Sequence, residues 1–162
     1  MGLLLEKSAG LWRTQVGRVY PEVLPRLISV FTWYFYRGLR LPICSFLRGL
    51  LHYYGLDLIN LNPNSITQLV VFVHLCEGYL GIPPHFNLWR YLYFCKCHNK
   101  EGQALYVGGA RFQLRDSMKQ HYLDLPLLTS NKFWTHKWFV MDNSENSIPP
   151  NSRCVPPGAD SW

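Results

Sequence analysis

Residues 42–55 read PICSFLRGLLHYYG, and this stretch decides which kind of fold the chain adopts. Its apolar side chains recur at i, i+3, i+4, i+7, i+8 and i+11, which places them on one face of a helix. Pro42 suits the first helical turn, and Gly55 can end the helix in a left-handed conformation. The opposite face carries Arg48 and His52. The pattern predicts an amphipathic helix, with its apolar face made by Ile43, Phe46, Leu47, Leu50, Leu51 and Tyr54.

A second helix is predicted directly downstream, where residues 62–81 read NPNSITQLVVFVHLCEGYLG. Asn62 is a good N-cap, Pro63 fits the first helical position, and Gly81 lies just past the end near Tyr79. The segment is apolar nearly all round. A helix of that kind is buried, so we expect it at the centre of the domain.

Two further helices are predicted on either side of this pair. Upstream, apolar residues at helical spacing begin after Glu22 and end before Gly38, although their β-branched and aromatic content leaves a strand open. Downstream, Pro83 and Pro84 turn the chain into a short helix over about 86–95. The upstream spacing is set by Leu24, Leu27, Ile28, Phe31 and Phe35.

The chain after Lys96 has a strand-like character. Residues 103–107 and 110–115 alternate apolar and polar side chains around Gly108-Gly109, which predicts a β-hairpin. A third strand is predicted at about 136–141. The fold class is therefore α+β, with an N-terminal helical bundle of about four helices and a small antiparallel β-sheet in the C-terminal part. We expect a loosely ordered lead-in over 1–19, one domain over 20–142, and a disordered Asn/Ser/Pro-rich tail over 143–162.

The charge is concentrated in the first third of the chain. Residues 1–56 contribute +5 of the net charge of +6. Such a region suits an anionic partner, although a solvated helix face with arginines lying over apolar rings would look the same. The arginines that we assign to nucleic-acid binding are Arg37, Arg40, Arg48, Arg111 and Arg115.

The aromatic share of 15% leaves two interpretations open. The rings fill a large core, or some of them form a surface for a partner protein. Candidates for such a protein contact are Trp33, Tyr53 and Trp89.

The five cysteines do not form an even set, so they indicate reduced thiols in an intracellular protein. Cys95, Cys97 and His98 are a weak zinc candidate, because structural sites normally place two residues between paired cysteines and here there is one. The alternative is the end of a helix with incidental thiols. We expect no cofactor. No apolar run reaches membrane-spanning length, and no dense basic run marks a nuclear location, which stays open.

Catalytic motifs are missing from the sequence. It contains no GxxxxGK[ST] phosphate loop, no GxSxG elbow, no HExxH and no zinc-finger spacing. Its ten acidic residues are scattered rather than grouped for two metal ions. These absences favour a protein without catalytic activity or a small-molecule substrate.

Several motifs in a fixed order resemble one known family. They are RGLRLP at 37–42, FLRGLLHYYGL at 46–56, LNPNSI at 61–66, LCEGYLGI at 75–82, PHFNLW at 84–89, GGARFQLR at 108–115 and the paired tryptophans of 134–139. This order is similar to that of the gypsy-type transposon domain of plant genomes, also named gypsy-type transposase. The resemblance covers roughly residues 20–142. It implies a retrotransposon-derived protein and carries no catalytic residues with it.

Three functions follow as expectations. The first is a non-catalytic module of a transposon-derived protein that binds nucleic acid or assembles with itself through the basic N-terminal third. The second is a protein-interaction module that uses surface aromatic residues. The third is a truncated transposase or nuclease fragment.

Overall fold

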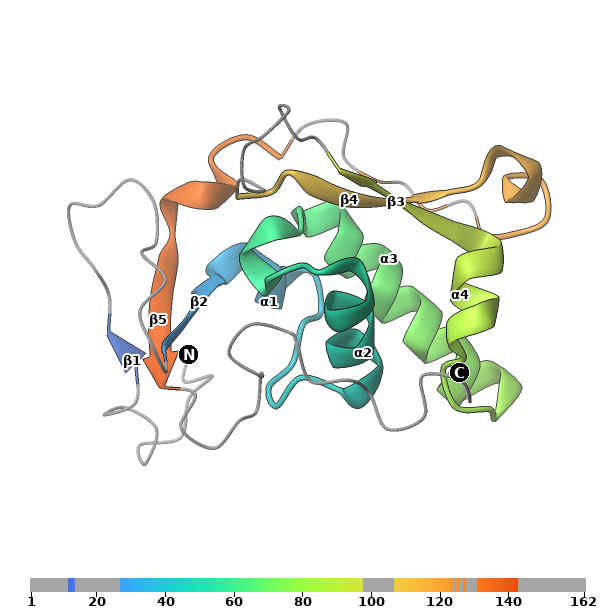
Figure 1. Ribbon diagram of the computed structural model, residues 1–162, viewed down its shortest axis with the longest axis horizontal. Coiled ribbons are helices and arrows are strands. Elements are labelled where there is room, and N and C mark those ends of the chain that lie inside the picture. The colour runs from blue at the N-terminus through green and yellow to red at the C-terminus, as the bar shows by residue number, and fades with distance from the viewer. Residues whose placement is uncertain are drawn as a thin grey trace.

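The computed structural model describes residues 12–13, 27–97, 107–123, 125, 127 and 131–142, and it confirms the α+β class. Two small antiparallel sheets are separated by helices (Figure 1). The helices are α1 (Thr32–Tyr36), α2 (Ser45–Tyr54), α3 (Pro63–His74) and α4 (Phe86–Leu92). The strands are β1 (Trp12–Arg13), β2 (Leu27–Phe31), β3 (Tyr93–Cys97), β4 (Ala110–Leu114) and β5 (Trp138–Asp142).

Helices α2 and α3 confirm the two strongest predictions. Gly55 ends α2 in the left-handed conformation. The side chain of Asn62 caps α3 by accepting a hydrogen bond from the Ser65 N–H at 2.8 Å. Helix α2 begins at Ser45 rather than at Pro42, and α3 continues beyond His74 as a π-helical turn, η3 (Leu75–Leu80).

Aromatic residues fill the centre of the core. The Trp89 ring lies 5.1 Å from that of Phe72, 5.0 Å from Phe112 and 4.2 Å from Tyr93, measured between centroids. Phe46 adds contacts from α2. All five residues are buried, so these aromatic residues serve the core.

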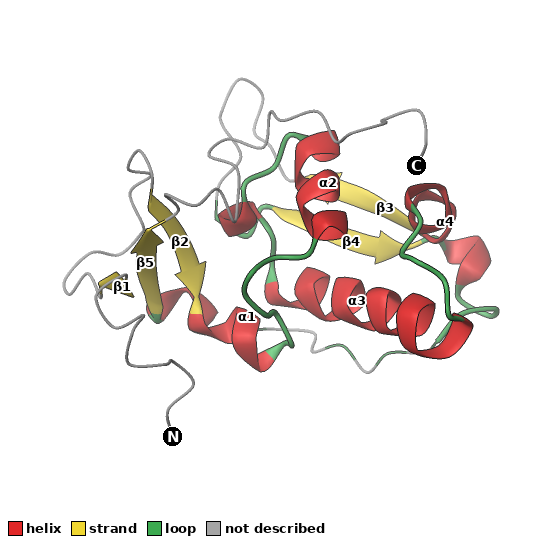
Figure 2. Cartoon of the chain, turned by 90° about the horizontal axis from the view of Figure 1, so that it is seen from below, coloured by secondary structure: helices red, strands yellow, loops and turns green. Residues whose placement is uncertain are grey.

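The helix predicted between Glu22 and Gly38 is wrong over the first half of its described length. Residues 27–31 form β2, which pairs antiparallel with β5, and only 32–36 are helical. Strand β1 pairs with the other edge of β5, so the sheet order is β1-β5-β2 (Figure 2). The apolar spacing reflects a strand with a buried end at Val30 and Phe31, followed by a short helix that buries Tyr34.

Strand β4 has a partner that the sequence analysis did not predict. Strand β4 pairs with β3, in the register Tyr93 opposite Leu114 and Cys97 opposite Ala110. The proposed partner 103–107 lies outside the described residues except for Val107, which is in a turn. Helix α4 ends at Leu92, because the residues after it extend to meet β4. The C-terminal sheet is thus two sheets, each of which uses a strand from earlier in the chain.

Polar contacts join the start of α3 to β4. The Asn62 N–H donates to the Ala110 carbonyl at 3.2 Å, and the Phe112 N–H donates to the Ser65 hydroxyl at 2.9 Å. Helices α2 and α3 therefore lie beneath one face of β3–β4, and none of the described α-helices lies on the other face (Figure 1). None of the described helices has the length and apolar character that crossing a bilayer requires.

Candidate nucleic-acid interface

The side of β3–β4 that points away from α2 and α3, here named the outer face, consists of Phe94, Lys96, Arg111 and Gln113. Successive side chains of a strand point to opposite sides, so the alternation that buries Tyr93, Ala110 and Phe112 directs these four residues outward. Phe94 and Lys96 are exposed, and Arg111 and Gln113 are half-buried.

Two cations face each other across this sheet. Lys96 lies directly opposite Arg111 in the register. Like charges at such positions repel and destabilise the pairing. The Arg111 Nε is also buried and has no hydrogen-bond partner among the described residues. This arrangement places two positive charges side by side on the sheet.

Arg115 continues the outer face beyond the end of β4. Its N–H donates to the Leu92 carbonyl at 2.8 Å, and its Nε donates to the Arg90 carbonyl at 3.0 Å. Its Cζ lies 5.9 Å from the centroid of the Phe94 ring. The backbone bonds and the ring hold the guanidinium in place, so little side-chain entropy remains to be lost on binding an anion.

Arg90 extends the positive surface to α2. Its Cζ lies 5.5 Å from the Tyr53 ring centroid and 5.8 Å from that of Phe86. Burial raises the pKa of Tyr54 to about 12, and the charges of Arg90 and Arg115 act in the opposite direction. Both guanidinium groups are therefore close enough to influence the same phenol.

Few carboxylates oppose these cations. Asp116, next to Arg115, is paired with Lys119 at 2.6 Å, and this hydrogen bond lowers the pKa of Asp116. Within the described residues, none of Lys96, Arg90, Arg111 and Arg115 forms a salt bridge. Among the described residues, these four cations therefore have no carboxylate partner.

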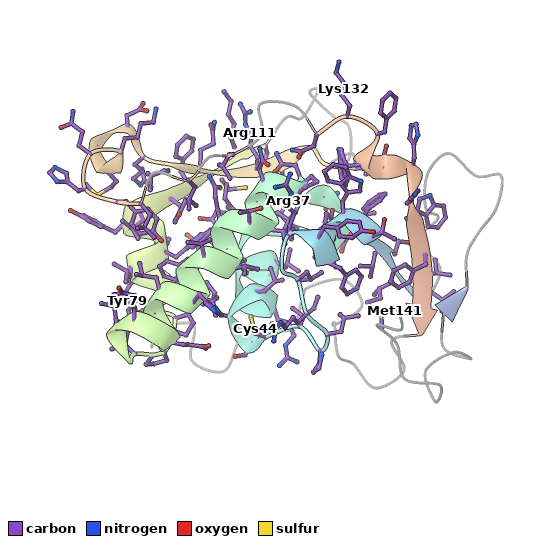
Figure 3. The ribbon with its side chains drawn as sticks, turned by 180° about the vertical axis from the view of Figure 1, so that it is seen from behind. Arg37, Cys44, Tyr79, Arg111, Lys132 and Met141 are labelled. Carbon is purple, nitrogen blue, oxygen red and sulfur yellow. The ribbon has the colours of Figure 1, made fainter. Side chains whose placement is uncertain are left out.

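The other predicted arginines are placed differently. The Arg37 Nη2 donates to the Asn131 side-chain carbonyl at 2.9 Å, and its Cζ lies 5.7 Å from the Trp33 ring centroid. Asn131 in turn donates to Asn64 in the first turn of α3. Arg37 thus ties the segment before β5 to α3 (Figure 3). Arg40 is exposed after α1, and Arg48 is half-buried on α2.

The structure therefore brings two of the five predicted arginines, Arg111 and Arg115, onto one surface. Across the described part of the chain, no hydrogen bond or ring contact joins Arg37, Arg40 or Arg48 to that surface. The sequence interpretation missed Lys96 and Arg90. The alternation Tyr93-Phe94-Cys95-Lys96 could have revealed Lys96, had the segment been read as a strand rather than as the end of a helix.

The Cys95 and Cys97 thiols are in contact, with 3.6 Å between their sulfur atoms. Burial, together with the Cys97 thiol, raises the pKa of Cys95 to about 12, which disfavours the thiolate that a metal ion binds. His98, the third member of the zinc candidate, lies outside the described residues. Among the residues that are described, no group of three His, Cys, Asp or Glu side chains could hold a metal ion.

The three aromatic residues predicted to contact a partner protein differ in how far they are buried. Trp89 is fully buried in the core, so its assignment to the surface is wrong. Trp33 is half-buried beneath Arg37, and Tyr53 is 51% exposed. A further exposed apolar group lies at the end of η3, far from Arg37 and Arg111 in Figure 3, and consists of Tyr79, Leu80 and Ile82.

Comparison with protein families gives one match, over residues 28–97, to the family described as "Putative gypsy type transposon". The matched segment runs from β2 to the end of β3. The predicted resemblance extended to residue 142, and β4 and β5 lie beyond the match. Neither the curated proteins nor the solved structures contain a significant match to the chain.

Proposed function

Residues 28–97 carry the gypsy type transposon domain, and from this premise we propose that the chain is a non-catalytic, nucleic-acid-binding module of a plant transposon-derived protein. The observation that carries the proposal is the outer face of β3–β4. There, Lys96, Arg111 and Arg115 present positive charge that no carboxylate among the described residues neutralises. Lys and Arg side chains of this kind bind phosphate oxygens, and this supplies most of the affinity of sequence-independent binding.

The site differs from the one expected from net charge alone. The basic N-terminal third contains Arg37, which is already bound to Asn131. The later part of the chain, which contains β3 and β4, has a lower net charge than the N-terminal third. Its cations nevertheless lie together, because alternate side chains of a strand point to the same side. Convergence of cations, rather than their number, determines how many phosphates one strand of nucleic acid can contact at once.

The first experiment measures binding of the whole chain to labelled DNA and RNA over a salt series. We expect the affinity to fall steeply with salt, because each phosphate contact releases bound counterions. The variant K96Q/R111K/R115Q should bind more weakly and reduce the salt slope by roughly two. Keeping a cation at 111 preserves the half-buried stem.

Arg40→Gln serves as the matched control, since Arg40 is exposed and lies outside the outer face. It should leave both affinity and slope nearly unchanged. Equal losses from both variants would mean that total charge rather than the outer face governs binding. If neither DNA nor RNA binds at low salt, the proposed function is wrong.

The apolar end of η3 favours a second candidate function, which is self-association. Tyr79 is 87% exposed, Leu80 53% and Ile82 41%. Exposed apolar groups of this size often mark protein contacts. Sedimentation at high salt would show concentration-dependent dimers that Tyr79→Ser/Leu80→Ser abolishes, whereas a monomer at all concentrations would exclude this function.

A further inference from the structure

Two arginines lie over aromatic rings, and a hydrogen bond to a backbone carbonyl links the two ring contacts into one path of contacts. It runs from Phe94 to Arg115, whose Nε donates to the Arg90 carbonyl, and then from Arg90 to Tyr53. The path thus joins β3, the end of β4, α4 and the end of α2. We name it the arginine–aromatic path.

The path differs from a surface that binds phosphates alone. Phe94 is 37% exposed and Tyr53 is 51% exposed, so each ring keeps area open to solvent beside its guanidinium. Exposing an aromatic ring costs free energy that a lysine or serine at the same position would not. A duplex gives these rings no partner, because its bases are stacked on one another.

A single strand of nucleic acid has unpaired bases that can stack on the exposed rings of the path. Unpaired bases stack on aromatic rings and on guanidinium planes, while the phosphates between them accept hydrogen bonds from the arginine N–H groups. Arg115 and Arg90 are held by rings and by a backbone carbonyl, so their planes are oriented before a ligand arrives.

We propose that the arginine–aromatic path binds single-stranded nucleic acid, with bases stacked at Phe94 and at Tyr53 and phosphates held by Arg115 and Arg90. This rests on the proposed function and specifies its ligand. DNA and RNA share the chemistry of base and phosphate, so the two sources are separated by experiment.

The test compares four labelled probes of equal length with the whole chain: single-stranded DNA, single-stranded RNA of the same sequence, the DNA duplex, and a single strand of abasic sugar-phosphate. The proposal expects the single strands to bind roughly tenfold or more tightly than the duplex and the abasic strand. A difference between the DNA and RNA arms identifies the natural source.

The variant Phe94→Leu/Tyr53→Leu keeps an apolar side chain at both positions and leaves all charges unchanged. It should lose roughly tenfold or more in affinity for the base-containing single strands, retain its affinity for the abasic strand and keep the same salt slope. Phe94→Leu alone, on the outer face, provides the test if the double variant unfolds by circular dichroism. Tyr36→Leu, another exposed aromatic, is the control that should change nothing.

Failure of this inference is distinct from failure of the proposed function. Equal affinity for duplex, abasic and base-containing strands, or no effect of Phe94→Leu, would overturn the stacking path while leaving phosphate binding in place. Loss of binding to every probe at low salt would overturn both.

Discussion

The two sheets of this molecule use the same strand pairing for different purposes. Strand β2 pairs with β5 from the other end of the described chain, and it places Val30 and Phe31 fully inside the core. Strands β3 and β4 are near neighbours in sequence, and their fully buried residues, Tyr93, Ala110 and Phe112, all belong to the inner face. The first sheet therefore stabilises the fold by joining two segments that are far apart in the sequence. The second sheet instead carries the exposed side chains of the outer face.

The largest expected effect comes from introducing an aspartate into each sheet and comparing the loss of stability. Val140→Asp places a charge at a position in β5 that is 3% exposed, and it should destabilise the fold by about 4 kcal/mol or more. Gln113→Asp, on the outer face of β4, should cost less than about 1 kcal/mol. Urea unfolding of both variants measures the difference, and comparable losses would mean that the outer face is also core.

A smaller effect is expected where the turn before β4 packs against the short helical turn before β5. A Cβ added at Gly108 would lie 2.5 Å from the Trp134 ring, and the glycine has φ +71°. Gly108→Ala should therefore cost about 3 kcal/mol, combining left-handed strain with the steric clash.

Gly55→Ala is the matched control for this change. Gly55 has φ +62°, but a Cβ there would meet nothing within 4 Å. It should cost only about 1 kcal/mol, the strain without the clash. Equal free energies of unfolding for the two variants would argue against close packing of Trp134 on the turn before β4.

A third effect concerns the hydrogen bond that links α3 to β4. Ser65→Ala removes the hydroxyl that accepts the buried Phe112 N–H, and it should cost about 1–3 kcal/mol. Thr67→Ala removes a hydroxyl bonded only within its own helix, to Pro63, and should cost less. Thermal unfolding followed by circular dichroism compares the pair, and a neutral Ser65→Ala would show that β4 does not depend on α3.

The smallest effect is a difference in the rate at which cysteines react, and it tests the burial of Cys95 on the inner face of β3. At pH 7.5 iodoacetamide should modify exposed Cys97 and Cys44 at least tenfold faster than Cys95, whose raised pKa of about 12 keeps it protonated. The thiolate is the nucleophile, so the gap should narrow as the pH rises toward 12. Peptide mass spectrometry measures each rate, and equal rates near neutral pH would contradict the burial of Cys95.

Local sequence predicted the elements whose signals are local. The α2 periodicity and the Asn62 cap of α3 depend on residues within one or two turns, and both predictions are confirmed. The error at β2 has a physical cause: its partner β5 lies far along the chain, and no short window of sequence contains the competing strand. The pairing of β4 with β3 was missed for a similar reason, because residues 93–95 were interpreted as the end of a helix.

The candidate surface was predicted in the same partial way. Arg111 and Arg115 were predicted only as basic residues for nucleic-acid binding, and the geometry of β4 places both on one side. Arg90 reaches that surface only through the contact of α4 with the end of β4, which is tertiary. Arg37 shows the converse: its charge suggested a free cation, while the fold engages it with Asn131.

The pairing of β2 with β5 also has a consequence in time. Thr32 donates to the Lys137 carbonyl across 105 residues of sequence. At a synthesis rate of about 5–20 residues per second, β2 would leave the ribosome roughly 5–20 s before its partner. During that interval its edge would be unsatisfied and open to pairing with other chains. The nascent protein would therefore be most vulnerable to aggregation just before synthesis reaches β5, and a chaperone holding residues 27–31 would protect it through that delay.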